Sequence, residues 1–113
     1  MKVLLLGCGK ARSRNISFFD GPNDFSNDQL TTIDIDPASE PDIKMDLSYL
    51  SIGELLPFSD DSFDEIHAYD VLEHLGTQGD WRGYFTEFAE YHRVLKTGGL
   101  FFYTCADWRR CFV

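Results

Sequence analysis

A short apolar run that ends at two glycines constrains the fold of this chain more than any other feature. Residues 3–6 are apolar at every position, and Gly7, Cys8 and Gly9 follow at once. A strand that is apolar on both faces is typical of the interior of a parallel sheet. Glycines directly after such a strand let the backbone turn sharply and approach a ligand closely. A simple tight turn would need the same glycines, so they do not decide the function alone.

The rest of the chain alternates between strand-like and helix-like segments. Short runs bounded by turn residues predict further strands at residues 30–33, 41–45, 63–69 and 100–103. A short helix is expected within residues 49–55, and the clearest helical periodicity spans residues 80–96. This order predicts an α/β fold, a Rossmann-like open sheet that is mostly parallel, with about five strands. The length favours a single domain over residues 1–113.

The predicted helix at residues 80–96 has recognisable ends and an aromatic stripe. Asp80 is a plausible N-cap, and Gly98 lies just past the expected end. Aromatic residues recur at steps of three and four, which predicts that they face the core; they are Trp81, Tyr84, Phe85 and Phe88.

Charge and cysteine content narrow the function classes. The formal net charge is -9, from 19 acidic and 10 basic residues, which argues against a broad nucleic-acid surface or an anionic membrane as partner. The three cysteines show no CxxC spacing and indicate a reduced, cytoplasmic chain. The apolar run near the N-terminus is too short for a signal peptide or a membrane span.

Acidic and aromatic residues stand at the ends of the predicted strands, where open α/β sheets bind ligands. Asp34 ends the second strand, and a carboxylate there can accept hydrogen bonds from both hydroxyls of a ribose. Asp46 follows the third strand and can accept a bond from an exocyclic amine, or can cap the next helix. Asp36 is better placed than Asp34 for a capping role. Tyr69 and Asp70 end the fourth strand.

Several segments, in order along the chain, resemble class I S-adenosylmethionine-dependent methyltransferases, most closely the methyltransferase-11-like proteins with a short first helix. They cover residues 3–9, 32–37, 42–47, 56–66, 70–75 and 93–100. The resemblance implies that the chain binds S-adenosylmethionine and releases S-adenosylhomocysteine. It implies a site in which Gly7, Cys8 and Gly9 lie against the methionyl part of the cofactor and Lys10 also belongs to the binding loop. In that site, Asp34 holds the ribose, Asp46 binds the amine of the adenine, and the adenine ring lies between Ile35 and Leu47. Backbone groups at Tyr69 and Asp70 flank the sulfonium.

The sequence also departs from the family pattern. Leu5 stands where an acidic residue is usual, and Ala11 stands where the loop usually has its third glycine. The full fold has two further strands after the fifth, which this chain lacks. We therefore expect an exposed apolar sheet edge that two chains pair in a homodimer; it is formed by Leu100, Phe101, Phe102 and Tyr103. The alternative is that the chain is an incomplete product of a longer gene.

The most direct functional interpretation is a methyltransferase that acts on an unknown, small-molecule acceptor. A non-catalytic module that binds S-adenosylmethionine or S-adenosylhomocysteine is the alternative, and a fragment of a dinucleotide-binding dehydrogenase is a third interpretation. Asp70 and then His74 are the candidates for a general base, although both also suit a helical turn after the fourth strand. His67 in mid-strand is expected to serve packing or to lie on the surface, and no metal site is predicted.

Overall fold

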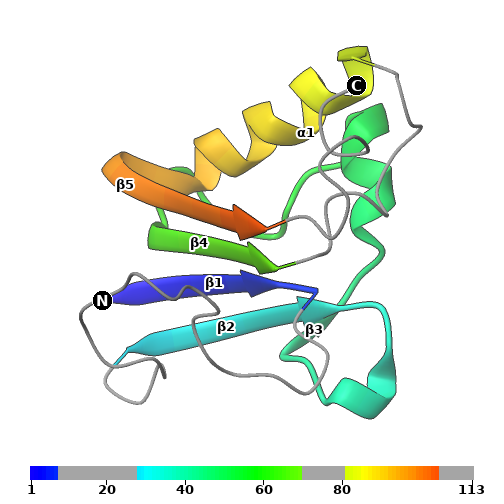
Figure 1. Ribbon diagram of the computed structural model, residues 1–113, viewed down its shortest axis with the longest axis vertical. Helices are drawn as coiled ribbons and strands as arrows, with labels where there is room; N and C mark the ends of the chain where they lie inside the picture. Colours follow the sequence, from blue (N-terminus) through cyan, green and yellow to red (C-terminus); the bar gives the residue numbers. More distant parts are fainter. Residues whose placement is uncertain (8–27, 70–80, 105–113) are drawn as a thin grey trace.

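A computed structural model describes residues 1–7, 28–69 and 81–104 of the chain (Figure 1). Its elements, in chain order, are β1 (Lys2–Leu6), β2 (Gln29–Asp34), the 3₁₀ helix η1 (Pro37–Ser39), β3 (Ile43–Lys44), the 3₁₀ helix η2 (Leu47–Ile52), β4 (Phe63–Tyr69), α1 (Trp81–Val94) and β5 (Leu95–Thr104). The predicted strand at residues 63–69 is confirmed at both ends. The other predicted strands are present with shifted bounds, and the short helix forms as η2, earlier than expected.

The strands form one five-stranded sheet in the order β3-β2-β1-β4-β5, and every neighbouring pair is parallel. Figure 1 shows the long strands pointing the same way, so their carboxyl ends share one edge. Leu6 of β1 lies opposite Ile33 of β2 and Ala68 of β4. The predicted α/β, Rossmann-like fold is confirmed, with β1 as the central strand.

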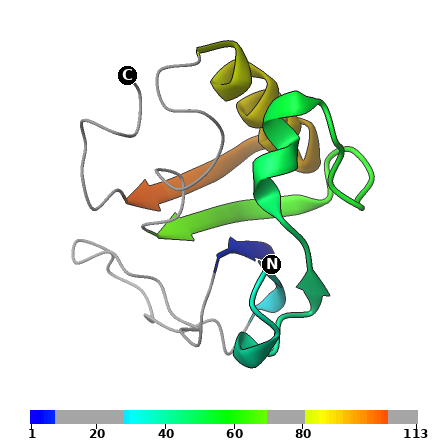
Figure 2. The same cartoon turned by 90° about the vertical axis from the view of Figure 1, so that its right-hand side faces the viewer.

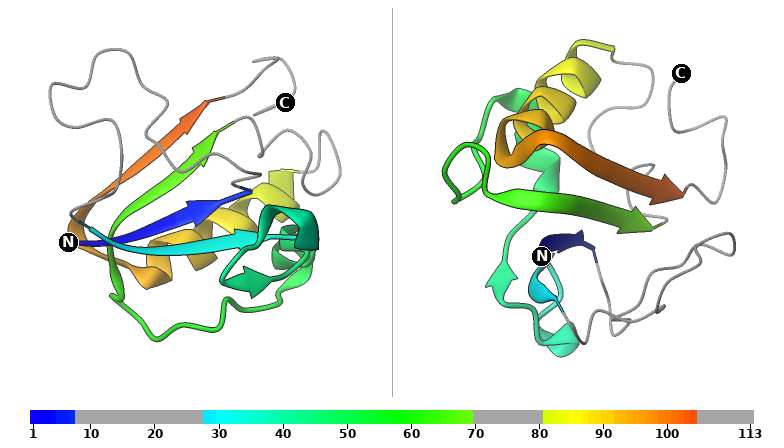
Figure 3. Two further views of the ribbon diagram at one scale, coloured as in Figure 1. Left: turned by 90° about the horizontal axis from the view of Figure 1, so that it is seen from below. Right: turned by 90° about the vertical axis from the view of Figure 1, so that its left-hand side faces the viewer.

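The larger core lies on the face of the sheet that α1 covers, which we call the helix face. Alternate residues of β1 and β4 point to it, among them Leu4, Leu6 and Ile66, each completely buried. Seen from below, α1 lies on one side of the strands (Figure 3), and η2 packs beside α1 (Figure 2). Leu50 of η2 belongs to this core. Burial of these side chains supplies most of the apolar driving force for the fold.

The other side of the sheet, which we call the opposite face, also buries the central strand. Val3 is 0% and Leu5 is 2% exposed, and Leu30 and Tyr69 pack against them. The inference from residues 3–6 is therefore confirmed, since β1 is buried on both faces. This face is unusual in its polar content, because Thr32, Glu65 and His67 are buried as well.

The end of α1 differs from the prediction. The helix ends at Val94, and Leu95 already pairs with Phe63 in the sheet. Between this pair and the next, Glu65 with Leu100, β5 carries extra residues that bulge out of the ladder. Gly98 adopts a φ of 82°, and a Cβ on Gly99 would lie 2.9 Å from the Asp64 carbonyl oxygen. The glycines therefore shape a bulge inside β5 rather than the helix end.

The face of α1 that packs also differs from the predicted aromatic stripe. Phe85 is 71% exposed and points away from the core, whereas Tyr84 and Phe88 are half-buried. The helix buries another set of positions: Gly83, Glu87, Glu90, Tyr91 and Val94. Two glutamates are tolerated there because hydrogen bonds inside the protein satisfy their carboxylates. The periodicity therefore predicted the helix and the core contact of Phe88 correctly, but it wrongly placed Phe85 in the core.

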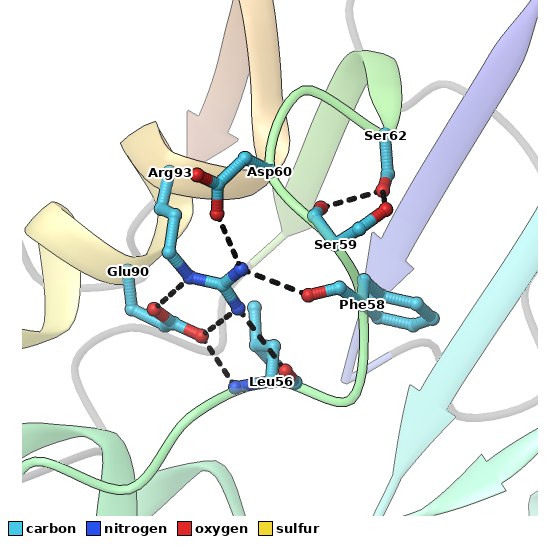
Figure 4. A network of polar contacts seen from close by, with 7 residues as sticks. All are labelled: Leu56, Phe58, Ser59, Asp60, Ser62, Glu90 and Arg93. Atoms are coloured by element: carbon cyan, nitrogen blue, oxygen red, sulfur yellow. Dashed lines mark hydrogen bonds and ion pairs between the residues drawn. The ribbon is translucent and has the colours of Figure 1, made fainter.

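A charged clamp ties the end of α1 to the loop before β4 (Figure 4). The Arg93 guanidinium donates to the Glu90 carboxylate at 2.7 Å, to the carbonyls of Phe58 and Leu56 at 2.8 and 3.1 Å, and to Asp60 at 2.9 Å. The bonds with Glu90 and Asp60 raise the pKa of Arg93 above its ordinary value. Burial works to raise the pKa of Glu90, but bonds from Arg93 and the Leu56 amide lower it overall. The clamp fixes the loop that leads into β4.

β5 is an edge strand of the described sheet. Leu100 is 56% and Tyr103 is 43% exposed there. Pairing of two such edges in a homodimer stays a prediction. No described helix combines the length and hydropathy needed to cross a bilayer.

Candidate cofactor site

The first corner of the candidate site is the turn at the carboxyl end of β1. Gly7 has a φ of 58°, a left-handed conformation that residues with a side chain adopt at a cost. Its amide donates a 2.8 Å hydrogen bond to the Ile33 carbonyl of β2, which fixes the turn against the neighbouring strand. The glycine predicted to approach the ligand thus sits at the carboxyl edge of the sheet.

The second corner is the end of β2. Asp34 is half-buried, and one carboxylate oxygen accepts a 3.0 Å bond from the Asp36 amide. Asp36 is the N-cap of η1 and accepts from the Ala38 amide at 2.9 Å, so its predicted capping role is confirmed. Ile35, between the two acids, is 56% exposed. A carboxylate and an exposed apolar side chain therefore adjoin the Gly7 turn.

The third corner, after β3, has a structural task of its own. Asp46 is the N-cap of η2 and accepts a 3.0 Å bond from the Ser48 amide, so the capping interpretation holds for it. Leu47 is 4% exposed and belongs to the core of the helix face. Of the two residues predicted to sandwich a flat base, Ile35 is exposed near this edge, whereas Leu47 is almost wholly enclosed by protein.

The fourth corner is Tyr69, the last residue of β4. Its half-buried side chain lies on the opposite face, against the cluster of Val3 and Leu5. The phenol forms a hydrogen bond with Nδ1 of His67, and Nε2 of that ring is 2.7 Å from Oε1 of Glu65. His67 is completely buried and stacks on Phe102, with ring centroids 4.7 Å apart and planes at 17°.

The hydrogen-bonded row of Glu65, His67 and Tyr69 was not predicted from the sequence. A packing or a surface position was predicted for His67, and its complete burial decides for packing, but its two polar partners were not predicted. The signal was available, since three polar residues occupy alternate positions of one strand. Alternate positions share a face, so such a row on a buried strand indicates a connected network.

The strand register decides which predicted residues come together. Gly7, Asp34 and Tyr69 end three neighbouring strands of the sheet, in the order β2-β1-β4. Asp46 follows β3 at the outer side of β2. Cys8, Gly9, Lys10 and Asp70, and the candidate base His74, lie outside the described residues.

Two hollows on the described surface lie away from this edge. One, of about 470 Å³, is at the amino end of the sheet and is lined by residues that include Lys2, Gln29 and Ser59. The other, of about 610 Å³, is a groove between α1 and the chain after η2, with Leu55 and Phe85 on its walls. Within residues 1–7, 28–69 and 81–104, no group of three or more His, Cys, Asp or Glu side chains is placed to hold a metal ion.

The sequence matches a known family, described as a methyltransferase domain, over residues 4–103. The chain belongs to this family. The matched region begins within β1 and ends within β5, so it spans the whole described sheet. The resemblance to class I S-adenosylmethionine-dependent methyltransferases is thereby confirmed, and members of the family typically use S-adenosylmethionine. A search of curated proteins gave no match.

Proposed function

We propose that this methyltransferase-family chain binds S-adenosylmethionine at the carboxyl edge of its sheet and transfers the methyl group to a small-molecule acceptor. The observation that carries the proposal is the juxtaposition of the left-handed Gly7 turn with the Asp34 carboxylate. The Gly7 amide is bonded to Ile33, the residue before Asp34. Open α/β sheets bind ligands at this edge.

The residues at the edge suit the chemical parts of this ligand. The half-buried Asp34 carboxylate offers acceptors for the two hydroxyls of a ribose. Gly7 lets an extended chain pass close to the backbone, because no Cβ stands in its way. Ile35 offers an exposed apolar surface for one face of an adenine, and Asp46 lies farther along the same edge.

S-adenosylmethionine, when bound, supplies an electrophilic methyl group on a sulfonium. The protein's contribution is then to hold the acceptor in line with that group and to exclude water. The net charge of -9 disfavours a polyanionic acceptor, which supports a small molecule.

Calorimetric titration with S-adenosylhomocysteine, with NAD as the second ligand, tests the proposal. We expect saturable binding of S-adenosylhomocysteine alone. Asp34→Ala should weaken it at least about tenfold, because hydrogen bonds to a charged group are worth about 1.5–3 kcal/mol. Asp36→Ala is the matched control and should change the affinity less than about threefold, since its cost falls on the η1 cap. Binding of NAD instead, or equal losses in the two variants, would overturn the assignment.

A second experiment separates an enzyme from a binding module. The chain is incubated with donor carrying a labelled methyl group and with pools of small alcohols, phenols, amines and thiols. Label transferred to a small molecule supports the enzyme. Tight binding without transfer to any pool supports the non-catalytic alternative.

A further inference from the structure

The apolar groove beside α1 has no part in the proposed function. Its volume is about 610 Å³, and it lies between α1 and the chain after η2, away from the carboxyl edge of the sheet. We infer that it is a docking site for a basic amphipathic helix of a partner protein. The apolar side chains of that helix enter the groove, and its cations face the carboxylates at the rim. The inference is independent of the proposed function, because no residue of the candidate cofactor site lines the groove.

Large apolar side chains are exposed on both walls of the groove. Phe85 of α1 is 71% exposed, and Leu55, beyond the end of η2, is 64% exposed. Ile52, next to the lining residue Gly53, is 78% exposed and extends the apolar surface onto η2. Single exposed apolar side chains are common on proteins, but a group of them around one hollow marks an interaction site. Their burial by a partner removes apolar area from water and so favours binding.

The shape of the groove suits a helix. Phe85 and Ala89 are four residues apart on α1, so they lie on the same side of it. The other uncharged lining residues, Gly53 and Thr86, are small like Ala89. Small side chains at a contact allow a second helix to approach closely, so that its own large side chains fill the hollow. Recognition of this kind uses apolar anchors that recur at steps of three and four residues.

The charged residues at the groove favour a basic partner. Glu54, Glu90 and Arg93 line it, and the Arg93 guanidinium is already bonded to the carboxylates of Glu90 and Asp60. In the part of the chain that the structure describes, the exposed Glu54 carboxylate makes no hydrogen bond or ion pair. Three carboxylates against one guanidinium leave this surface negative. It therefore attracts a cationic helix and repels a second copy of this chain, whose net charge is -9.

A designed peptide tests the inference. The peptide has about 18 residues, long enough to form a helix in water, with leucines along one face and lysines on the flanks. Fluorescence anisotropy of a label on the peptide measures its binding to the unmodified chain. We expect saturable binding that weakens several-fold between about 50 mM and about 300 mM salt, because salt screens surface charges. A peptide with glutamates in place of the lysines should bind at least about tenfold more weakly.

Substitutions in the groove show where the peptide binds. Phe85→Ser and Leu55→Ser should each weaken binding at least about tenfold, because a few apolar anchors carry most of the energy of an interface. Leu100→Ser, at a similarly exposed leucine of β5, is the matched control and should change the affinity less than about twofold. These positions are exposed, so we expect thermal melting to show that each variant folds.

The contribution of charge has its own pair of variants. Glu54→Gln should weaken the lysine peptide about threefold and reduce the salt dependence, because it removes a carboxylate from the rim. Glu40→Gln, the same substitution at an exposed residue just after η1, is the control and should leave both the affinity and its salt dependence unchanged.

The outcomes decide between the occupants of the groove. Preference for the lysine peptide, with losses in Phe85→Ser and Leu55→Ser but not in Leu100→Ser, supports the docking site. Absence of saturable binding, equal binding of the two peptides, or an equal loss in Leu100→Ser overturns it. Sedimentation tests a second copy as occupant, since a dimer of the unmodified chain that Phe85→Ser dissociates would also overturn it. Titration with S-adenosylhomocysteine tests the proposed function separately.

Discussion

Both faces of this sheet bury carboxylates, but the carboxylates have different hydrogen-bond partners on the two faces. On the helix face, Glu90 is held by the Arg93 guanidinium in a charged clamp. On the opposite face, Glu65 is held by the imidazole of His67, which is bonded in turn to a phenol. The clamp binds a loop at the amino end of β4, whereas the row runs to its carboxyl end. The first network therefore anchors the loop before β4, and the second reaches the edge of the sheet at which we propose that the ligand binds.

The strongest test of this comparison is to remove the clamp. Arg93→Ala leaves the Glu90 side chain, which is 5% exposed, without its cation and removes donors from the carbonyls of Leu56 and Phe58. We expect a loss of about 2–4 kcal/mol in the free energy of unfolding, measured with urea. Affinity for S-adenosylhomocysteine, corrected for the folded fraction, should be unchanged.

Lys96→Ala is the control for Arg93→Ala, because it also removes a cation near the end of α1 but one that lies outside the clamp. Lys96 pairs with Asp64 at 3.3 Å, but the two side chains are 44% and 35% exposed. Exposed pairs contribute little, so we expect a change of less than about 0.5 kcal/mol. Equal losses in the two variants would contradict the role of the clamp.

The carboxyl of Glu87, also on the helix face, sharpens the comparison, because within the described residues no cation pairs with it. Burial raises the pKa of Glu87 to about 7, although the 2.8 Å bond from the Tyr91 hydroxyl lowers it. The folded state therefore binds this proton more tightly than the unfolded state, whose pKa is close to 4.5. Stability is retained at low pH and falls as the pH rises from about 4.5 through about 7.

Glu87→Gln should remove this pH dependence. Between pH 5 and pH 8 the variant should gain up to about 3 kcal/mol of stability relative to the unmodified chain, since each pKa unit corresponds to about 1.4 kcal/mol. Urea unfolding at several pH values measures it. The same substitution at Glu54, which is exposed, is the control. If the free energy of unfolding depends on pH in the same way in the unmodified chain and in Glu87→Gln, burial does not raise the pKa of Glu87.

The smallest expected effect concerns the hydrogen bonds of a buried hydroxyl on the opposite face. Thr32 is 2% exposed, and its hydroxyl accepts from the Asp42 amide at 2.9 Å and donates to the Asp42 carboxylate at 3.3 Å. Thr32→Val removes this acceptor and should cost about 1–2 kcal/mol in urea unfolding. Thr31→Val on the same strand is the matched control, because in the described part of the chain the Thr31 hydroxyl makes no hydrogen bond. An unchanged free energy of unfolding in Thr32→Val would mean that other contacts hold β3 in place.

Most of the fold was predictable because hydrophobic periodicity reports burial directly. The run at residues 3–6 predicted a strand buried on both faces, and Leu4 and Leu5 are indeed buried on different sides. Motif order predicted the family, and the strand ends predicted where Gly7 and Asp34 would lie. The candidate site was less predictable, since Asp46 and Leu47 turned out to serve the η2 cap and the core.

The sequence by itself determined the strands, the parallel α/β class and the family, because these follow from local patterns and from motifs in order along the chain. Only the tertiary structure decided that α1 buries Glu87 and Glu90 and exposes Phe85, since the packing face depends on partners distant in sequence. It also decided that His67 joins Glu65 to Tyr69. Such a network depends on side-chain rotamers and on burial by neighbouring strands, and neither is encoded in the spacing of three polar residues.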